Sequence, residues 1–299
     1  MSTMDETNMQ WVQVITDIAG DQSEVLEEAL HRLGALSVTQ EDAADQPLFE
    51  PDPGDTPLWN AVRTTGLFPA KIDTNQLLDS LKTELPEIHE FKIEILEDKD
   101  WIREWMDQFQ PMRFGKRLWI CPSWHTSPAP EATNIMLDPG LAFGTGTHPT
   151  TALCLEWLDT AIIENKSLID FGCGSGVLGV AAALLGSREV ISLDIDPQAL
   201  LATTANAEKN NVAEKLKVDY PNKFIEKPAD ILIANILSGP LVQLAPQLTR
   251  LIKPGGVIVL SGILPEQADQ IIKTYQNAFT LCEPTVRDGW VRIEGLRRS

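Results

Sequence analysis

The sequence predicts an α/β protein in which a doubly wound, mostly parallel sheet over residues 135–299 is preceded by a smaller α+β domain over residues 1–97. Three observations predict this class. Beyond Thr147, helical and strand-like patterns alternate, which indicates a largely parallel sheet covered on both faces. Residues 11–97 instead show a strand, helix and strand pattern twice. A glycine-rich segment at 168–176 separates an apolar strand pattern from an apolar helical one.

The domain at residues 1–97 shows the element order βαββαβ, which is the ferredoxin-like order. Its helices are recognised by an apolar stripe along one side, and its strands by short β-prone runs between turn residues. The expected strands are Trp11–Ile18, Ala35–Gln40, Leu58–Leu67 and Phe91–Leu96, and the expected helices are Ser23–Leu33 and Thr74–Leu85.

Residues 98–134 differ in character from both domains, and we expect a connector with its own local packing. Trp101 and Trp105 lie one helical turn apart, a spacing more typical of a buried helix face than of a recognition surface. The segment from Met112 to Ile120 resembles a hairpin, and a proline-rich loop follows it.

The domain at residues 135–299 alternates helices and strands to its end. In such sheets ligands bind outside the carboxyl ends of the strands, near the point where the strand order reverses, so the glycine-rich segment marks the expected site. The expected helices are 149–163, 176–185, 197–210, 240–252 and 265–276, and the expected strands are 168–171, 189–193, 229–234 and 256–260, followed by two final strands.

Length and composition limit the class of protein. The 299 residues, 43% of them hydrophobic, fit a soluble chain of about two domains. The N-terminus lacks the features of a signal peptide, and no apolar run approaches the roughly 20 residues of a membrane span, so we expect a cytoplasmic protein. Four dispersed cysteines and four histidines, without a Cys-x-x-Cys pair, predict neither a disulfide framework nor a metal site.

Most of the negative charge lies in the first third of the chain. Residues 1–100 contain 6 Lys and Arg against 22 Asp and Glu, so they carry −16 of the formal net charge of −19. Such a surface repels phosphate backbones and attracts cationic partners, although generic solubility also explains it. We expect no direct nucleic-acid binding by this domain.

The glycine turn in the second domain has the composition of a nucleotide cradle. Gly172, Gly174 and Gly176 allow positive φ and let bare backbone approach a ligand. The segment from Gly174 to Gly179 satisfies the Gly-x-Gly-x-x-Gly pattern, and Asp194 ends the next strand. A carboxylate there can accept hydrogen bonds from both ribose hydroxyls, so Asp194 is compatible with a nicotinamide or flavin cofactor and with other adenosine cofactors alike.

Neighbouring residues favour a methyl donor. Asp170 precedes the first glycine by two residues, Asp194-Ile195-Asp196-Pro197 follows the second strand, and Asn235 follows the strand at 229–234. Together they resemble the S-adenosylmethionine-dependent methyltransferases, although Asp170 alone is also compatible with a capping role. The resemblance implies S-adenosylmethionine as cofactor, contacts that include Asp170 and Gly174, and a seven-stranded Rossmann-like sheet of the class I type.

Longer motifs narrow the resemblance. The segment Leu137–Thr151, the tripeptide Asn235-Ile236-Leu237 and the segment Glu97–Trp101 resemble the ribosomal protein L11 methyltransferases, and the likeness covers essentially the whole chain. This family's activity is methyl transfer to lysine side chains and the N-terminal α-amine of L11, a basic protein that the acidic first domain would capture. We expect a monomer without membrane association. The resemblance implies cofactor contacts at Thr151, Gly172, Asp194 and Asn235, and a loop over the site at Phe143–Gly146.

The acceptor amine must be neutral, because an ammonium ion has no lone pair. At pH 7 this costs about 4.6 kcal/mol for a lysine and about 1 kcal/mol for an α-amine. No dedicated base is evident: His148, which precedes Pro149, fits a capping or packing role better than a catalytic one, so the catalytic residue stays unassigned. Asn235-Ile236-Leu237 lacks the aromatic ring of the Asn-Pro-Pro-aromatic pattern, which favours a flexible aliphatic amine over a planar acceptor.

Three alternatives remain at this level. A nucleic-acid or small-molecule methyltransferase could use the same fold, an adapter could retain the nucleotide domain without catalysis, and a nicotinamide dehydrogenase could use the same glycine pattern. They differ in whether a labelled methyl group reaches a ribosomal protein and in which cofactor the chain binds.

Overall fold

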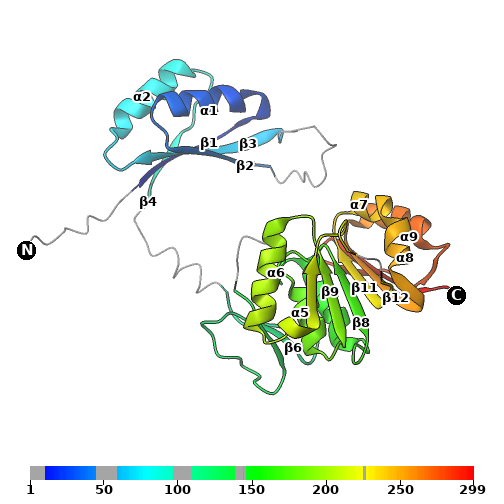
Figure 1. The fold of residues 1–299 in the computed structure, drawn as a ribbon. Helices are drawn as coiled ribbons and strands as arrows, with labels where there is room; N and C mark the ends of the chain where they lie inside the picture. The colour runs from blue at the N-terminus through cyan, green and yellow to red at the C-terminus, as the bar shows by residue number, and fades with distance from the viewer. Residues whose placement is uncertain (1–10, 45–58, 97–108, 139–143, 145, 225–226) are drawn as a thin grey trace, which may run out of the picture. The chain divides into compact units, whose positions relative to one another are not determined.

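The computed structural model describes residues 11–44, 59–96, 109–138, 144, 146–224 and 227–299. The chain divides into two compact units, Met1–Gln108 and Phe109–Ser299. Figure 1 shows each of them as a sheet with helices packed against it.

The first unit has four antiparallel strands in the order β2-β3-β1-β4, with α1 and α2 on one face (Figure 1). This arrangement confirms the predicted ferredoxin-like fold. Val12, Val14 and Ile18 alternate along β1 and are buried against Leu26 and Leu30 of α1. The elements are β1 Trp11–Ala19, α1 Ser23–Arg32, β2 Ser37–Asp42, β3 Ala61–Pro69, α2 Thr74–Glu84 and β4 Lys92–Leu96.

The described part of the expected connector, residues 109–134, contributes to the second unit. Phe114, Leu118 and Ile120 are buried in the same core as residues of α4 and α5. The apolar side chains of this segment therefore pack against those helices as well as within the segment. Trp101 and Trp105 lie outside the described residues. The segment and the residues after it form a small sheet in the order β5-β6-β7, with β5 Met112–Phe114, β6 Leu118–Cys121 and β7 Thr133–Met136.

The main sheet of the second unit has the continuous strand order β10-β9-β8-β11-β12-β15-β13. The strands from β10 to β12 are parallel, whereas β15 runs antiparallel to β12 and β13. This path has the seven strands expected, and β14 pairs with β15 as an eighth. The strands are β8 Ser167–Phe171, β9 Glu189–Leu193, β10 Leu216–Asp219, β11 Ala229–Asn235, β12 Ile252–Ile263, β13 Phe279–Leu281, β14 Thr285–Arg287 and β15 Trp290–Arg297.

Helices cover both faces of this sheet, as in a doubly wound fold (Figure 1). Leu168 and Ile233 point to the face covered by α4, α5 and α6, while Ile169 and Leu232 point to the face covered by α7, α8 and α9. Successive strand residues alternate between the two cores, which explains their nearly continuous apolar sequence. The helices are α4 Pro149–Thr160, α5 Val177–Leu184, α6 Pro197–Lys209, α7 Ser238–Gln243, α8 Ala245–Arg250 and α9 Ala268–Tyr275.

Three elements differ from expectation. The helix expected at 240–252 is two short helices, because Pro246 has no N–H to donate and is accommodated in the first turn of α8. Strand β10 was not expected, because its four residues are too few to show a clear periodic pattern. Two final strands were expected, whereas three, β13, β14 and β15, follow α9. The additional strand belongs to the hairpin β14–β15, which turns at Asp288 and Gly289. Both residues have positive φ, and an Asp-Gly pair is a strong hairpin signal.

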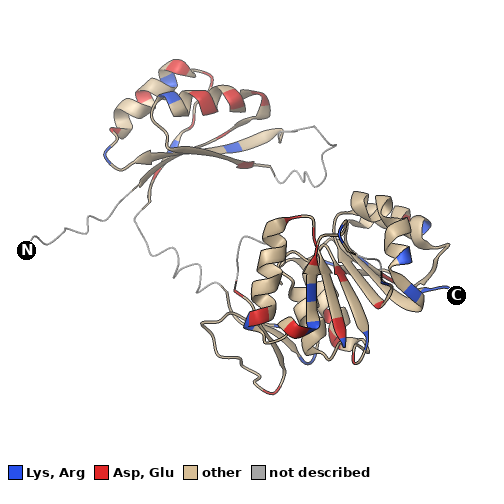
Figure 2. Cartoon of the chain, viewed as in Figure 1, with Lys and Arg blue, Asp and Glu red and all other residues tan. Residues whose placement is uncertain are grey.

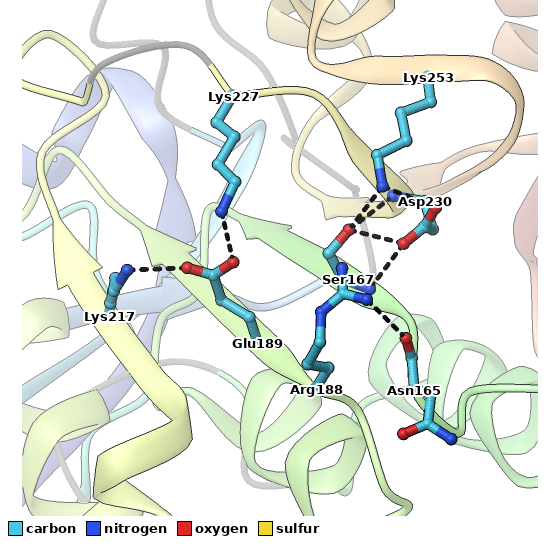
Figure 3. A network of polar contacts seen from close by, with 8 residues as sticks. All are labelled: Asn165, Ser167, Arg188, Glu189, Lys217, Lys227, Asp230 and Lys253. Carbon is cyan, nitrogen blue, oxygen red and sulfur yellow. Dashed lines mark hydrogen bonds and ion pairs between the residues drawn. The ribbon is translucent and has the colours of Figure 1, made fainter.

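The amino ends of the parallel strands are tied together by side chains. Asp230 of β11 accepts hydrogen bonds from the N–H of Ser167 on β8 at 2.9 Å and from its Oγ at 2.7 Å (Figure 3). Lys253 of β12 donates to the same carboxylate at 2.8 Å. These ties fix β8, β11 and β12 at the end opposite the glycine turn.

Within the described residues, every helix is too short or too polar to traverse a lipid bilayer.

Candidate cofactor site

The glycine turn connects the carboxyl end of β8 to α5. Gly172, Gly174 and Gly176 have φ values of 77°, 54° and 76°, which favour glycine strongly over other residues. A Cβ on Gly172 would collide with Cγ2 of Ile236, so bare backbone is also needed for space. The N–H of Gly172 donates to the carbonyl of Leu193 at 2.7 Å, which fixes the turn to β9.

Helix α6 and an upstream loop hold the other side of this turn. Thr203 Oγ1 donates to the carbonyl of Gly174 at 3.1 Å, and Asn206 Nδ2 donates to the carbonyl of Ser175 at 2.8 Å. Ser175 Oγ donates to the carbonyl of Gly144 at 2.7 Å. One residue of the expected loop at 143–146 is thus in contact with the turn, while Phe143 and Thr145 lie outside the described residues.

Asp194 follows β9 and is held by backbone donors. Its Oδ2 accepts from the N–H of Gly174 at 2.9 Å, and its Oδ1 accepts from the N–H of Asp196 at 3.0 Å. Each oxygen keeps a second lone pair, so the carboxylate can still accept hydrogen bonds from a ligand. The half-buried carboxylate is therefore preoriented at the edge of the turn.

Asp170 lies beneath the turn and is completely buried. Its Oδ2 accepts from the N–H of Gly179 in α5 at 2.9 Å, while Oδ1 has no hydrogen-bond partner among the described residues. Burial raises the pKa of Asp170 to about 7 against the effect of the Gly179 bond, and the charge of Asp194 adds to the rise. In this position the carboxyl group supports the first turns of α5 from below.

Thr151 and Asn235 meet across the sheet edge. Asn235 ends β11, and its Nδ2 donates to Oγ1 of Thr151 in the first turn of α4 at 3.3 Å. Because β11 is the neighbour of β8, this pair lies at the same carboxyl edge as Gly172. Ile236, which follows Asn235, is the side chain that faces Gly172.

His148 caps α4 rather than projecting as an isolated base. Its Nδ1 accepts from the N–H of Thr150 at 3.3 Å, and its ring packs edge-on against Trp290 with centroids 4.9 Å apart. Burial lowers the pKa of His148. This arrangement matches the capping role favoured from the sequence.

Sequence reasoning missed several residues that shape the site. Thr203 and Asn206 lie one turn apart on α6 and bond consecutive carbonyls of the glycine turn. Nothing in their local pattern distinguishes them from other polar helix residues. Ile236 belongs to the tripeptide that the sequence singled out, but its local pattern does not show that it faces Gly172.

The residues at this edge fit an adenosine-type cofactor. The turn presents bare backbone, Asp194 provides a preoriented carboxylate for hydroxyl donors, and Thr151 and Asn235 add a hydroxyl and an amide. No group of three or more His, Cys, Asp or Glu side chains suited to a metal ion occurs within the described ranges. The carboxylate, hydroxyl and amide groups that are present suit an organic ligand with hydroxyl and amino groups.

The strand order, the glycine turn and the acid at the end of the second strand define a class I S-adenosylmethionine-dependent methyltransferase. A family model described as "Ribosomal protein L11 methyltransferase (PrmA)" matches residues 10–298. The chain belongs to the ribosomal protein L11 methyltransferase family. This membership excludes the dehydrogenase and adapter alternatives.

Relatives and a solved structure agree with this assignment. The ribosomal protein L11 methyltransferase of Azotobacter vinelandii is 54% identical over 295 residues, which cover 97% of this chain and 100% of the relative. Those of Pseudomonas putida and Pseudomonas aeruginosa are 54% and 53% identical with the same coverage. The crystal structure of a ribosomal protein L11 methylase from Lactobacillus delbrueckii subsp. bulgaricus has a TM-score of 0.58 and 28% identity, over 64% of this chain and 100% of that chain.

Proposed function

We propose that this enzyme transfers methyl groups from S-adenosylmethionine to lysine side chains and to the N-terminal α-amine of ribosomal protein L11. The observation that carries the proposal is the gathering of Thr151, Gly172, Asp194 and Asn235 at one sheet edge. Relatives that are 54% identical over their full length and are named ribosomal protein L11 methyltransferase support the choice of L11 as substrate. We expect the enzyme to act as a cytoplasmic monomer.

The proposed cofactor contacts divide by chemistry. Asp194 accepts hydrogen bonds from the ribose hydroxyls, because its carboxylate is already fixed by two backbone donors. Gly172 and Gly174 let the backbone of the turn approach the methionine portion. Thr151 and Asn235 contribute polar groups beside it. When bound, S-adenosylmethionine supplies an electrophilic methyl group on a positively charged sulfur.

In the proposed arrangement Asp170 supports the cofactor site indirectly, through its bond to helix α5. The sequence-based expectation of a direct cofactor contact stays a prediction, and the complete burial of Asp170 favours an indirect role through Gly179. A carboxyl group in that position fixes the start of α5, and with it the glycine turn that precedes the helix.

The protein positions a neutral amine and removes it from water. We expect backbone carbonyls around Asn235 to accept hydrogen bonds from the amine, and Leu237 is 44% exposed at the same edge. An apolar surface disfavours the ammonium form of an incoming amine, which lowers the cost of having it neutral. No aromatic ring follows Asn235 directly, which favours a flexible aliphatic amine. We therefore propose that the enzyme accelerates methyl transfer by aligning the amine with the methyl group and by removing the amine from water.

We further propose that residues 1–97 recognise the basic substrate. Figure 2 marks Asp and Glu positions in red along α1 and α2 of the first unit. Glu24 and Glu28 on α1 and Asp79 on α2 are exposed or partly exposed members of this surface. Opposite charges steer association and raise its rate, most strongly at low ionic strength.

The proposal is tested with labelled S-adenosylmethionine and undermethylated L11, followed by mapping of the products by mass spectrometry. We expect methyl groups on lysine side chains and on the α-amine, and none on an unrelated basic ribosomal protein. Absence of label from L11 would refute the substrate assignment.

The role of the first unit is tested separately by charge reversal. Glu24→Lys combined with Asp79→Lys should raise the KM for L11 several-fold at low salt and leave the Kd for S-adenosylmethionine unchanged. Glu214→Lys, an exposed reversal in the second unit, is the matched control. Equal KM values for the two variants would count against recognition by the first unit.

A further inference from the structure

The start of α4 depends on an unusual capping residue. Nδ1 of His148 accepts from the N–H of Thr150 at 3.3 Å and lies 2.8 Å from Thr150 Oγ1. Helix N-caps are usually Ser, Thr, Asp or Asn, whose oxygens accept at every pH near neutrality. A histidine accepts only through an unprotonated nitrogen, because an imidazolium donates from both. The cap of α4 is therefore a titratable group, unlike a Ser, Thr or Asn cap.

The capped turn is the same turn that reaches the sheet edge. Ser261 Oγ of β12 donates to the carbonyl of Thr150 at 3.1 Å, and Asn235 Nδ2 of β11 donates to Thr151 Oγ1 at 3.3 Å. Thr150 and Thr151 are only 2% and 1% exposed. His148 thus binds the N–H of Thr150, while the carbonyl of Thr150 and the hydroxyl of Thr151 face the sheet. The cap and the bond from Asn235 to Thr151 therefore lie in the same turn of α4.

The surroundings of the ring keep His148 neutral. Trp290 packs against it with ring planes inclined at 66°, and burial lowers its pKa. Four cations and four carboxylates lie on the adjoining elements, so their charges give no net attraction for a proton. These charged groups are Arg113 on β5, Glu156 and Asp159 on α4, and Arg287, Asp288, Arg292, Glu294 and Arg297 on the hairpin β14–β15.

We propose that His148 is a positioning residue for the cofactor site: its neutral ring holds the first turn of α4 so that Thr151 meets Asn235, and protonation of Nδ1 releases this turn and weakens the binding of S-adenosylmethionine. The proposal rests on the cofactor site proposed above. It assigns His148 no contact with the methyl group or with the acceptor amine.

The sign of the pH effect follows from the lowered pKa. At neutral pH the ring is unprotonated and the cap is complete. As the pH falls through the lowered pKa, protonation turns Nδ1 from an acceptor into a donor, and the N–H of Thr150 loses its partner. Affinity for S-adenosylmethionine is therefore full at neutral pH and decreases on the acid side.

The experiment compares His148→Ala with His148→Asn by calorimetric titration of S-adenosylmethionine between about pH 5 and pH 8. Asn places an oxygen where Nδ1 lies and caps helices without titrating. We expect His148→Ala to raise the Kd at pH 7.5 by roughly 3- to 30-fold, the range of a lost cap. His148→Asn should restore affinity and remove the acid-side decline seen in the wild type.

Asp73→Ala is the matched control, because Asp73 caps α2 in the first unit through the N–H groups of Asn75 and Gln76. It should reduce stability similarly and leave the Kd unchanged. Equal Kd values for His148→Asn and His148→Ala, or the same acid-side decline in His148→Asn and wild type, would overturn the inference. So would normal cofactor affinity in His148→Asn combined with lost turnover, which would indicate a catalytic base. A wild-type chain that does not bind S-adenosylmethionine would refute the proposed cofactor site itself.

Discussion

The carboxylate of Asp194 accepts a hydrogen bond from the backbone N–H of Gly174 at 2.9 Å. This bond joins the end of β9 to the middle of the turn that follows β8. The neighbouring N–H of Asp196 holds the second oxygen at 3.0 Å. The acid that is proposed to bind the ribose therefore also shapes the turn beside the methionine portion, so the two halves of the site depend on one side chain.

Asp194→Ala should weaken S-adenosylmethionine binding strongly. Loss of hydrogen bonds to a charged group corresponds to about 10- to 150-fold in Kd. Asp194→Asn, which keeps one acceptor oxygen, should fall between this variant and the wild type. Calorimetric titration measures both, and thermal unfolding reports whether the turn has also been disturbed. An unchanged Kd in Asp194→Ala would remove Asp194 from the cofactor site.

Asn235→Ala should reduce methyl transfer much more than stability. Its amide donates to Thr151 at the proposed site, and because the residue is only half-buried, the truncation should cost about 1 kcal/mol of unfolding free energy or less. We expect kcat/KM for L11 methylation to fall at least about 10-fold.

Asn210→Ala provides the matched comparison for Asn235→Ala. Asn210 is also half-buried, and its amide exchanges hydrogen bonds of 2.7 and 2.8 Å with the backbone of Met136, at the C-terminal end of α6. Turnover by this variant should stay close to that of the wild type. Equal losses of turnover in the two variants would show that Asn235 acts only through the fold.

Gly172→Ala should destabilise the protein for two separable reasons. The positive φ of 77° costs an alanine about 1–2 kcal/mol, and the new methyl group collides with Ile236. Ile236→Ala removes the collision but not the backbone cost, so the double variant should be more stable than the sum of the single changes indicates. Chemical denaturation of the four proteins measures this coupling. Strict additivity would mean that the two residues do not compete for the same space.

Much of the site could be predicted because it follows from sheet topology. Asn235 ends a strand, and Gly172 and Asp194 each follow one directly, so a parallel sheet places all three at a single edge. The glycine spacing likewise indicated a turn with positive φ, which the structure has. Thr151 was assigned through the family resemblance, since a helix N-terminus alone does not show which strand end it approaches.

The rest could not be predicted because it depends on contacts between distant segments. The bond from Ser175 to Gly144 joins residues 31 positions apart, and Thr203 reaches Gly174 over 29 positions. The burial of Asp170 is another case, because its place two residues before the glycines did not show that its carboxylate turns toward α5. The local sequence pattern shows which element a side chain faces only when the positions of the neighbouring elements are known.

Asp230→Ala should destabilise the protein by about 2 kcal/mol at pH 7, because the buried N–H of Ser167 loses its acceptor and Lys253 loses its counter-ion. Burial alone would raise the pKa of Asp230, but the bonds from Lys253 and Ser167 outweigh it and hold the pKa well below its usual value (Figure 3). The stabilisation is therefore complete above about pH 4 and is lost as the pH falls through the lowered pKa.

Glu189→Gln is the comparison: its lysine partners are 72% and 66% exposed, so the loss should stay below about 1 kcal/mol. Urea denaturation from pH 7 down to about pH 3 measures both effects, and an equal loss in the two variants would show that the bond to Ser167 contributes nothing beyond the ion pair.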